Sequence, residues 1–218
     1  MIKKNKVTLI ITSLITLIPI LVGLLLWKKL PEQVPFHWNI NGEVDSWASK
    51  TQAIFLMPLL MLAMHWVCVF ASTADPKSKN YHPKSIHLVL WICPILNLVI
   101  HTMVYGTALG YAISIERIMP LLMGALFIFI GNLLPKMRQS YTMGIKLPWT
   151  LNNEENWNKT HRLAGKIWVG GGVVILSTAI LGSFWILIAM MAVMVLIPVI
   201  YSYRLYRKQT QTDEGGQA

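Results

Sequence analysis

Apolar residues fill six long blocks of this sequence, and polar residues gather in the segments between the blocks. Each block holds roughly 20 residues with no charge in its central part, which is the length a helix needs to cross about 30 Å of hydrocarbon. The six predicted spans are 7–26, 54–72, 86–109, 118–134, 163–181 and 184–203. The pattern therefore predicts an all-α, polytopic membrane protein with six transmembrane helices.

The first block follows a basic start, as a secretory signal does. It is too long for the core of a signal peptide, and no small-residue cleavage site comes after it. Trp27, Lys28 and Lys29 follow instead, and aromatic and basic residues are typical of an anchor at the membrane interface. We therefore expect an uncleaved first helix.

Charge sets the expected orientation. The chain is 55% hydrophobic and 13% charged, with a net charge of +10, and 15 of its 19 Lys and Arg lie in segments on the same side as the N-terminus. The positive-inside rule places that side, with both termini, in the cytoplasm. The excess of Lys and Arg is thereby explained by topology and contact with anionic membrane lipids, so no direct binding of nucleic acid is expected.

The polar segments also suggest how the chain is divided. We expect an N-terminal two-helix membrane domain at 1–85 with an extracellular loop at 30–50, a third helix at 86–109, a C-terminal three-helix domain at 110–208 with a cytoplasmic loop at 135–162, and a disordered cytoplasmic tail at 209–218.

The extracellular loop carries the signal of a small hairpin. Asn41 and Gly42 form the pair that most favours a two-residue turn, because both central positions of that turn need a positive φ. This turn would place Ile40 opposite Glu43. We therefore expect a short extracellular hairpin after the first helix.

The same register tests a metal site. His37 would lie opposite Ser46, so Glu43 and Asp45 would point to the other face of the hairpin from His37. A shared metal would require a different register. Cys68 and Cys93 fall inside spans without the spacing of a disulfide framework or a zinc site. No metal or other cofactor is predicted.

The cytoplasmic loop leads into a predicted helix. Asn152 with Glu155 three residues later indicates the start of a helix that runs on into the fifth span. One face of this helix carries residues at spacings of 4, 3 and 4, namely Trp157, His161, Ala164 and Trp168. Packing against neighbouring helices and docking of a cytosolic partner are both open for this face.

Further along the fifth span, small residues recur every seven positions, at Gly165, Gly172 and Ala179. Small residues on one line let two helices approach closely in lipid. This line therefore predicts a helix-packing face with no chemistry of its own.

Polar residues within the spans are few. No carboxylate lies at mid-membrane, where ion-coupled transporters place them, and the candidates for a polar path are His65, Asn97 and His101. A small exporter or channel stays as the alternative function. No catalytic motif is present, and a membrane enzyme would have to use either His37 with Asp45, or Glu154, Glu155 and His161.

Two segments resemble the signatures of the SdpI family of bacterial membrane immunity proteins. Segment 30–50 is similar to the family's N-terminal signature, which carries Pro, His, Asn, Gly and Asp in the order found here at Pro35, His37, Asn39, Gly42 and Asp45. Segments 144–151 and 157–162 resemble its C-terminal signature, with Lys146 where many members have Arg. Both occur in the family's order, and the two domains cover nearly the whole chain.

The resemblance implies a function without catalysis in a bacterial cytoplasmic membrane. It implies protection against a secreted peptide toxin and, in the best-known member of the family, sensing of the toxin with capture of a cytosolic transcriptional repressor. The implied extracellular toxin-binding residues are Pro35, Phe36, His37, Trp38, Asn39, Gly42 and Asp45. The implied cytoplasmic partner-binding residues are Pro148, Trp149, Thr150, Trp157, Thr160, His161 and Arg162.

Overall fold

The computed structural model describes residues 2–215, and this part of the chain has six helices long and apolar enough to cross a membrane. They are α1 (Lys6–Leu25), α2 (Met57–Ala74), α3 (Pro83–Ala108), α4 (Ile115–Leu133), α6 (Glu154–Leu181) and α7 (Phe184–Gly215). The predicted six-span helical membrane architecture is confirmed.

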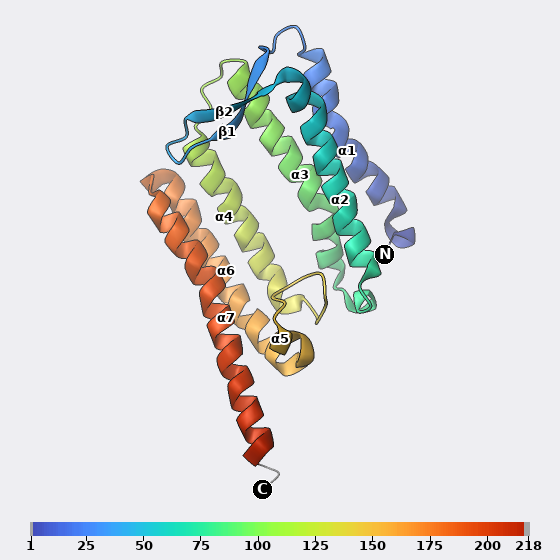
Figure 1. The fold of residues 1–218 in the computed structure, drawn as a ribbon, viewed down its shortest axis with the longest axis vertical. Helices are drawn as coiled ribbons and strands as arrows, with labels where there is room; N and C mark the ends of the chain where they lie inside the picture. The colour runs from blue at the N-terminus through green and yellow to red at the C-terminus, as the bar shows by residue number, and fades with distance from the viewer. Residues whose placement is uncertain (1, 216–218) are drawn as a thin grey trace. The chain divides into compact units, whose positions relative to one another are not determined.

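Shorter elements fill the connections (Figure 1). The strands β1 (Gln33–Trp38) and β2 (Val44–Ser49) form an antiparallel hairpin between α1 and α2, and α5 (Pro148–Asn152) lies in the loop before α6. Four helical turns adjoin the long helices or lie between them: η1 (Lys3–Asn5), the π-helical η2 (Gln52–Leu56), η3 (Ser78–Asn80) and η4 (Leu134–Lys136).

The described chain forms two compact units. The first contains α1, α2, the hairpin and most of α3, and it extends to Ala74 and then from Ile86 to Glu116. The second contains the segment Asp75–Ser85 and the chain from Arg117 onward, with α5, α6, α7 and most of α4. The third helix thus groups with the first two, and the connection between α2 and α3 belongs to the second unit.

Apolar contacts seat the hairpin on the helices of the first unit. Val34 of β1 and Ile54 of η2 are fully buried, and they share one cluster with Tyr105 of α3. Leu30, in the connection from α1, belongs to the same cluster. Because a two-stranded sheet is barely stable alone in water, this apolar base is what holds the hairpin in a fixed place.

Glycines bring α4 and α6 into close contact in the second unit. A Cβ built on Gly172 of α6 would lie 2.7 Å from the carbonyl oxygen of Gly124 in α4, and one built on Gly165 would lie 2.9 Å from the carbonyl oxygen of Gly131. Both helices therefore carry glycines seven residues apart at matching positions. The predicted packing role of Gly165 and Gly172 is confirmed.

A tight turn joins α6 to α7. Gly182 adopts a φ of 65° and ends α6 by donating its N–H to the carbonyl of Thr178 at 2.8 Å. The two helices then pack through a cluster that includes Ile175, Leu187 and Met194. The indole nitrogen of Trp168 also donates a hydrogen bond to the Met194 carbonyl at 3.0 Å.

Two helix boundaries differ from those expected. Asn153 caps α6, because its side chain accepts the N–H of Asn156 at 2.8 Å, so the cap lies one residue after the predicted Asn152. The helix does run on without a break to Leu181, as expected. At the other end, α7 is helical through 209–215, where the sequence predicts a disordered tail; the rest of that tail lies outside the described residues.

Candidate functional site

The turn of the hairpin contains three residues. The N–H of Asn39 donates to the carbonyl of Glu43 at 2.8 Å, and the N–H of Gly42 donates to the carbonyl of Asn39 at 3.0 Å. Gly42 has a φ of 78°, and no residue other than glycine has a positive φ in the described chain. This is a type I turn followed by a left-handed glycine, so the predicted two-residue turn with Ile40 opposite Glu43 is wrong.

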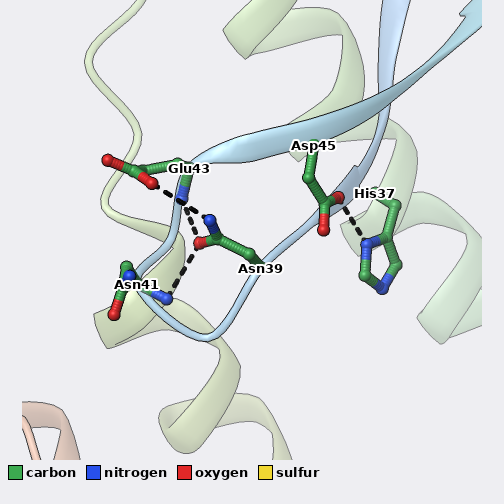
Figure 2. A network of polar contacts seen from close by, with 5 residues as sticks. All are labelled: His37, Asn39, Asn41, Glu43 and Asp45. Atoms are coloured by element: carbon green, nitrogen blue, oxygen red, sulfur yellow. Dashed lines mark hydrogen bonds and ion pairs between the residues drawn. The ribbon is translucent and has the colours of Figure 1, made fainter.

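The Asn39 side chain organises this turn (Figure 2). Its Oδ1 accepts the backbone N–H groups of Asn41 at 2.9 Å and Glu43 at 3.0 Å, and its Nδ2 donates to the Glu43 carboxylate at 3.0 Å. Asparagine is suited to this place because its short amide can bond the backbone just ahead of it. Asn39 therefore shapes the turn from within.

His37 and Asp45 form a hydrogen bond across the hairpin (Figure 2). The predicted pairing of His37 with Ser46 is confirmed, but the register shifts on either side of His37. These irregularities bring Asp45 to the same side as His37, with Nδ1 and Oδ1 2.6 Å apart. The prediction that Asp45 points to the opposite face is therefore wrong, because it assumed a regular ladder.

The hairpin residues implied by the resemblance differ in exposure. Phe36 is 45% exposed, and the His37 and Asp45 side chains are 65% and 41% exposed. Pro35 is buried, whereas Trp38, Asn39 and Gly42 are half-buried. Trp47, which pairs with Pro35, is 55% exposed. The accessible surface thus combines aromatic rings with the His37–Asp45 pair.

A buried lysine ties the base of the hairpin to the end of α1. Lys50 is 7% exposed, and its ammonium donates to the carbonyls of Trp27 at 3.3 Å and Leu30 at 3.4 Å and to the Glu32 carboxylate at 2.7 Å. It also lies 5.0 Å from the centre of a Trp27 ring. The cation thereby satisfies carbonyls just beyond the C-terminal end of a helix, where positive charge is favoured.

The three polar candidates inside the spans lie among α1, α2 and α3. His65 Nε2 is 3.1 Å from the hydroxyl of Thr12, and the Asn97 amide donates to the carbonyl of Thr16 at 2.7 Å. His101 Nδ1 lies 2.9 Å from the carbonyl of Asn97. His65 and Asn97 therefore link α2 and α3 to α1, whereas the His101 bond lies within α3. His65 Nδ1 and Asn97 Oδ1 are buried without a hydrogen-bond partner among the described residues.

Trp157 and His161 lie in the first turns of α6. They bind the segment that precedes this helix, the α4–α6 loop (residues 137–153). Their rings stack 4.0 Å apart, and the Trp157 indole donates to the carbonyl of Met137 at 2.8 Å. His161 Nε2 accepts the N–H of Ile145 at 2.9 Å, while Nδ1 faces the Trp157 carbonyl at 2.8 Å. This arrangement requires a neutral imidazole with its proton on Nδ1.

Gly144 makes this stack possible. Its φ is 106°, and a Cβ there would lie 2.5 Å from His161 Nε2 and 2.8 Å from the Trp157 ring. Only glycine fits both the backbone and the space. The two halves of the C-terminal signature, 144–151 and 157–162, therefore fold against each other.

The hydroxyls of Thr150 and Thr160, two further residues of the signature, are also turned inward. The Thr150 hydroxyl accepts the N–H of Leu147 at 2.9 Å and donates to the carbonyl of Ile145 at 2.8 Å. The Thr160 hydroxyl donates to the Asn156 side chain at 3.0 Å. The Thr150 bonds close the loop on itself, whereas the Thr160 bond lies within α6.

Ser202 of α7 holds the other side of the loop. Its hydroxyl accepts the Trp149 indole N–H at 3.0 Å, and its carbonyl accepts the Asn156 amide at 2.9 Å. The Trp149 ring packs against Tyr203 and is stacked 5.9 Å from Tyr206. The loop is therefore fixed to α7 as well as to α6.

The predicted partner-binding residues thus fall into two groups. Thr150, Trp157 and Thr160 are fully buried and His161 is 1% exposed, so these four support the loop from inside. Pro148 and Arg162 are exposed, and Trp149 is half-buried. Pro148 and Trp149 line a groove of about 470 Å³ together with residues of α7 that include Tyr206 and Gln209.

Sequence reasoning missed a buried carboxylate, Asp75, which follows the last residue of α2. It is 4% exposed. Its Oδ2 accepts the Tyr81 hydroxyl at 2.6 Å, the Tyr141 N–H at 2.8 Å and both the N–H and hydroxyl of Thr142 at 3.1 Å, and its Oδ1 accepts the Lys77 N–H at 2.8 Å. Asp75 therefore binds the α2–α3 connection to the α4–α6 loop.

These contacts change the acidity of both partners. Burial would raise the pKa of Asp75, but the hydrogen bonds from Tyr81, Lys77, Tyr141 and Thr142 outweigh it and leave that pKa below its usual value. Burial, followed by the bond to Asp75, raises the pKa of Tyr81 to about 12. At neutral pH the pair is therefore a carboxylate accepting from a protonated phenol.

Lys77 extends the network to α5. Its ammonium bonds the Gln139 side chain and lies 5.3 Å from the centre of the Tyr141 ring. The Gln139 amide in turn donates to the carbonyls of Thr150 at 2.9 Å and Leu151 at 2.7 Å. The one local signal in the sequence was an aspartate directly after an apolar span; its partners in the α4–α6 loop lie more than 60 residues away.

No group of three or more His, Cys, Asp and Glu is placed to hold a metal ion in the part of the chain that the structure describes. The Glu43 carboxylate bonds Asn39, away from the His37–Asp45 pair. The geometry of the hairpin therefore provides one hydrogen-bonded His–Asp pair and an aromatic surface.

Comparison with known proteins finds one family and one characterised protein that this chain resembles. Residues 136–202 match the SdpI/YfhL protein family, and residues 14–62 match a domain of unknown function, DUF1648. The chain is 28% identical to the immunity protein SdpI of Bacillus subtilis (strain 168), over 94% of this chain and 97% of that protein. No solved structure matches. The family match covers the α4–α6 loop, α6 and much of α7, and the likeness to SdpI extends along nearly the whole chain, so this multi-pass membrane protein is similar to the SdpI/YfhL family.

Proposed function

We propose that this chain is an immunity protein that protects a bacterial cell from a secreted, membrane-active peptide toxin. The observation that carries the proposal is its similarity to the immunity protein SdpI along nearly the full length of both chains. The hairpin adds support, since it is a rigidly seated element that presents aromatic and charged side chains outside the spans. The role is recognition, without a catalytic step.

The hairpin faces the outside of the cell in this proposal. The support is the distribution of charge, with 15 of the 19 Lys and Arg in segments on the other side of the membrane. Phe36, His37 and Asp45 would contact the toxin, because they are the most exposed of the residues that the resemblance implies. Pro35, Trp38, Asn39 and Gly42 would shape the surface that these three occupy.

A cytosolic partner, such as a transcriptional repressor, would bind at the α4–α6 loop. Pro148, Trp149 and Arg162 are the accessible residues of the predicted set, and the groove beside Trp149 gives a partner an aromatic floor. Thr150, Trp157, Thr160 and His161 would act indirectly, by holding this surface in shape.

Survival of a toxin-sensitive strain, with and without the protein, tests the proposal when the family's secreted toxin peptide is applied. We expect the protein to protect and Phe36→Ser or His37→Ala to abolish protection at an unchanged level of membrane-inserted protein. Tyr111→Ser, at an aromatic residue that is 68% exposed outside the hairpin, is the matched control and should protect fully. Protection that survives both hairpin changes would rule out the assigned surface.

An exporter or channel is the second candidate. It is favoured by two buried polar atoms without partners among the described residues, His65 Nδ1 and Asn97 Oδ1, which are the kind of groups that line a path for water or a polar solute. Simultaneous change of His65, Asn97 and His101 to Ala tests it. Loss of protection in a protein that still inserts would favour transport, and full protection would dispose of it.

A further inference from the structure

Asp75 stands where the chain passes from one compact unit to the other. The first unit ends its second helix at Ala74, and the second unit begins at Asp75. Three of the five hydrogen bonds to this carboxylate come from Tyr141 and Thr142, which are 66 and 67 positions away in the sequence. Two of these three donors are backbone N–H groups, so the position of the carboxylate constrains the backbone of the loop at Tyr141 and Thr142.

The other end of α2 is fixed to the hairpin. The N–H and hydroxyl of Ser49, the last residue of β2, both donate to the Gln52 side chain at 3.0 Å. From Gln52 the chain is helical through η2 and α2 to Ala74, over 23 residues. At 1.5 Å per residue this is a rod of about 35 Å, with the hairpin at one end and Asp75 next to the other.

The rod also begins with an uncommon helical turn. The first turn, η2, is π-helical, and such turns are rare and occur frequently at functional sites. Its Ile54 is fully buried in the same cluster as Val34 of the hairpin. A displacement of the hairpin therefore acts first on η2 and then along α2.

Resting on the proposed function, we propose that Asp75 is the positioning residue through which the state of the hairpin reaches the partner-binding loop. A shift or rotation of α2 moves the carboxylate, and the N–H groups of Tyr141 and Thr142 must move with it or lose their acceptor. Gln139, held by Lys77, carries the change to the carbonyls of α5, the helix that bears Pro148 and Trp149. Toxin on one side of the membrane would thus alter the surface on the other.

A cysteine introduced at position 140 can report the state of the loop. Ser140 is 1% exposed, and its hydroxyl bonds the backbone of Met143, so Ser140→Cys is nearly isosteric and its thiol is protected while the loop is closed. The experiment uses the full chain in membrane vesicles that expose the loop, with Cys68 and Cys93 changed to Ala. The rate at which a membrane-impermeant maleimide modifies the thiol at position 140 is measured.

The first comparison tests the anchor. Asp75→Asn and Tyr81→Phe should each raise the rate, by about tenfold for Asp75→Asn, because hydrogen bonds to a charged group are lost. If Asp75→Asn fails to insert into the membrane, Tyr81→Phe tests the anchor instead, because it removes only one hydroxyl donor to the carboxylate. Glu154→Gln, the same loss of charge at an exposed residue of α6, is the control and should match the parent. Parent rates in both variants would overturn the proposal.

The second comparison tests the relay without any toxin. Lys50→Met loosens the base of the hairpin and should change the rate of modification at position 140; Glu32→Gln is the milder substitute, because it weakens the Lys50 ion pair alone. In the Asp75→Asn background the same change should have no further effect. Independent, additive effects, or no response to either hairpin variant, would overturn the relay.

The third comparison adds the family's secreted toxin peptide. The rate should change in the parent and stay constant in Asp75→Asn. A toxin without effect on survival or on the rate, combined with a response to Lys50→Met that Asp75→Asn removes, would reject the proposed function and leave the relay in place. Protection against the toxin, combined with additive effects of Lys50→Met and Asp75→Asn on the rate, would support the proposed function and reject the relay.

Discussion

Single residues decide the geometry of the α4–α6 loop. Gly144, Trp157 and His161 meet at one point, and each satisfies a requirement that the others create: a positive φ, a ring to stack on and a neutral acceptor nitrogen. The sequence predicted that Trp157 and His161 share a helix face but left open whether that face binds a partner. Their burial explains their place in the signature by folding rather than by contact with a ligand.

Replacement of Gly144 should destabilise this loop. Gly144→Ala combines an unfavourable φ with a contact at 2.5 Å, and we expect a loss of roughly 2–4 kcal/mol in the free energy of unfolding. The thermal unfolding of the detergent-solubilised protein measures the effect. Gly110→Ala is the control, because Gly110 has a φ of 86° with nothing within 4 Å, so it carries the backbone strain without the collision. Equal losses in the two variants would contradict the role of the stacked rings.

The Asp75 carboxylate should give a defined dependence of stability on pH. Since its pKa in the folded protein is lowered, its contribution is present above the unfolded value of about 3.9 and is lost as the pH falls through the folded value. The parent should therefore exceed Asp75→Asn by about 2 kcal/mol from roughly pH 5 to pH 8. The difference should vanish in more acidic solution. Unfolding curves across this range test both statements, and a difference that persists at low pH would contradict them.

At the scale of elements, hydropathy was sufficient for the spans and insufficient for the turn. The six helices follow from apolar length, and the hairpin follows from Asn41 and Gly42. The same pair is compatible with a two-residue or a three-residue loop, and the side-chain bonds of Asn39 select the longer one. The hydrogen bond of His37 with Asp45 could not be predicted, since it depends on register shifts that an alternating pattern does not encode.

The glycine contacts between α4 and α6 lead to a matched pair of variants. Gly172→Ala should destabilise the second unit by roughly 1–3 kcal/mol, because its Cβ would lie 2.7 Å from a backbone oxygen of α4. Gly170→Ala, two residues away with nothing within 4 Å, should be neutral or slightly stabilising. The measurement is the midpoint of thermal unfolding in detergent. Identical midpoints for the two variants would show that close approach of the helices is not required.

At the scale of the whole molecule, the division predicted from the sequence follows the polar loops. The two compact units of the structure are instead defined by which residues contact one another. The segment Asp75–Ser85 lies between two helices of the first unit but belongs to the second. Hydropathy alone cannot reveal this, because the bonds of Asp75 reach across more than 60 residues. The buried Thr150 and Thr160 differ from Asp75 in this respect, since their hydroxyls bond Ile145 and Asn156, only five and four positions away.

Orientation is a prediction for the entire chain. Ile40→Cys, at a residue that is 63% exposed on the hairpin, should react with a membrane-impermeant thiol reagent added to intact cells. Lys146→Cys, exposed in the α4–α6 loop, should react only after the membrane is opened. Cys68 and Cys93 are replaced by Ala in both variants. Reversed accessibility would contradict the orientation drawn from the 15 Lys and Arg on one side.

Because α6 is one unbroken helix, the number of residues between its first turns and its glycines is fixed. Trp157 and His161 near its start and Gly165 and Gly172 further on belong to one helix. One residue inserted after His161 would turn everything beyond it by about 100° and carry both glycines away from α4. Insertions in residues 111–114, between α3 and α4, meet no such constraint. Insertions and deletions should therefore occur in residues 111–114 and be absent from 157–172, because the rotation of the glycines about the helix axis relative to Trp157 and His161 must stay constant.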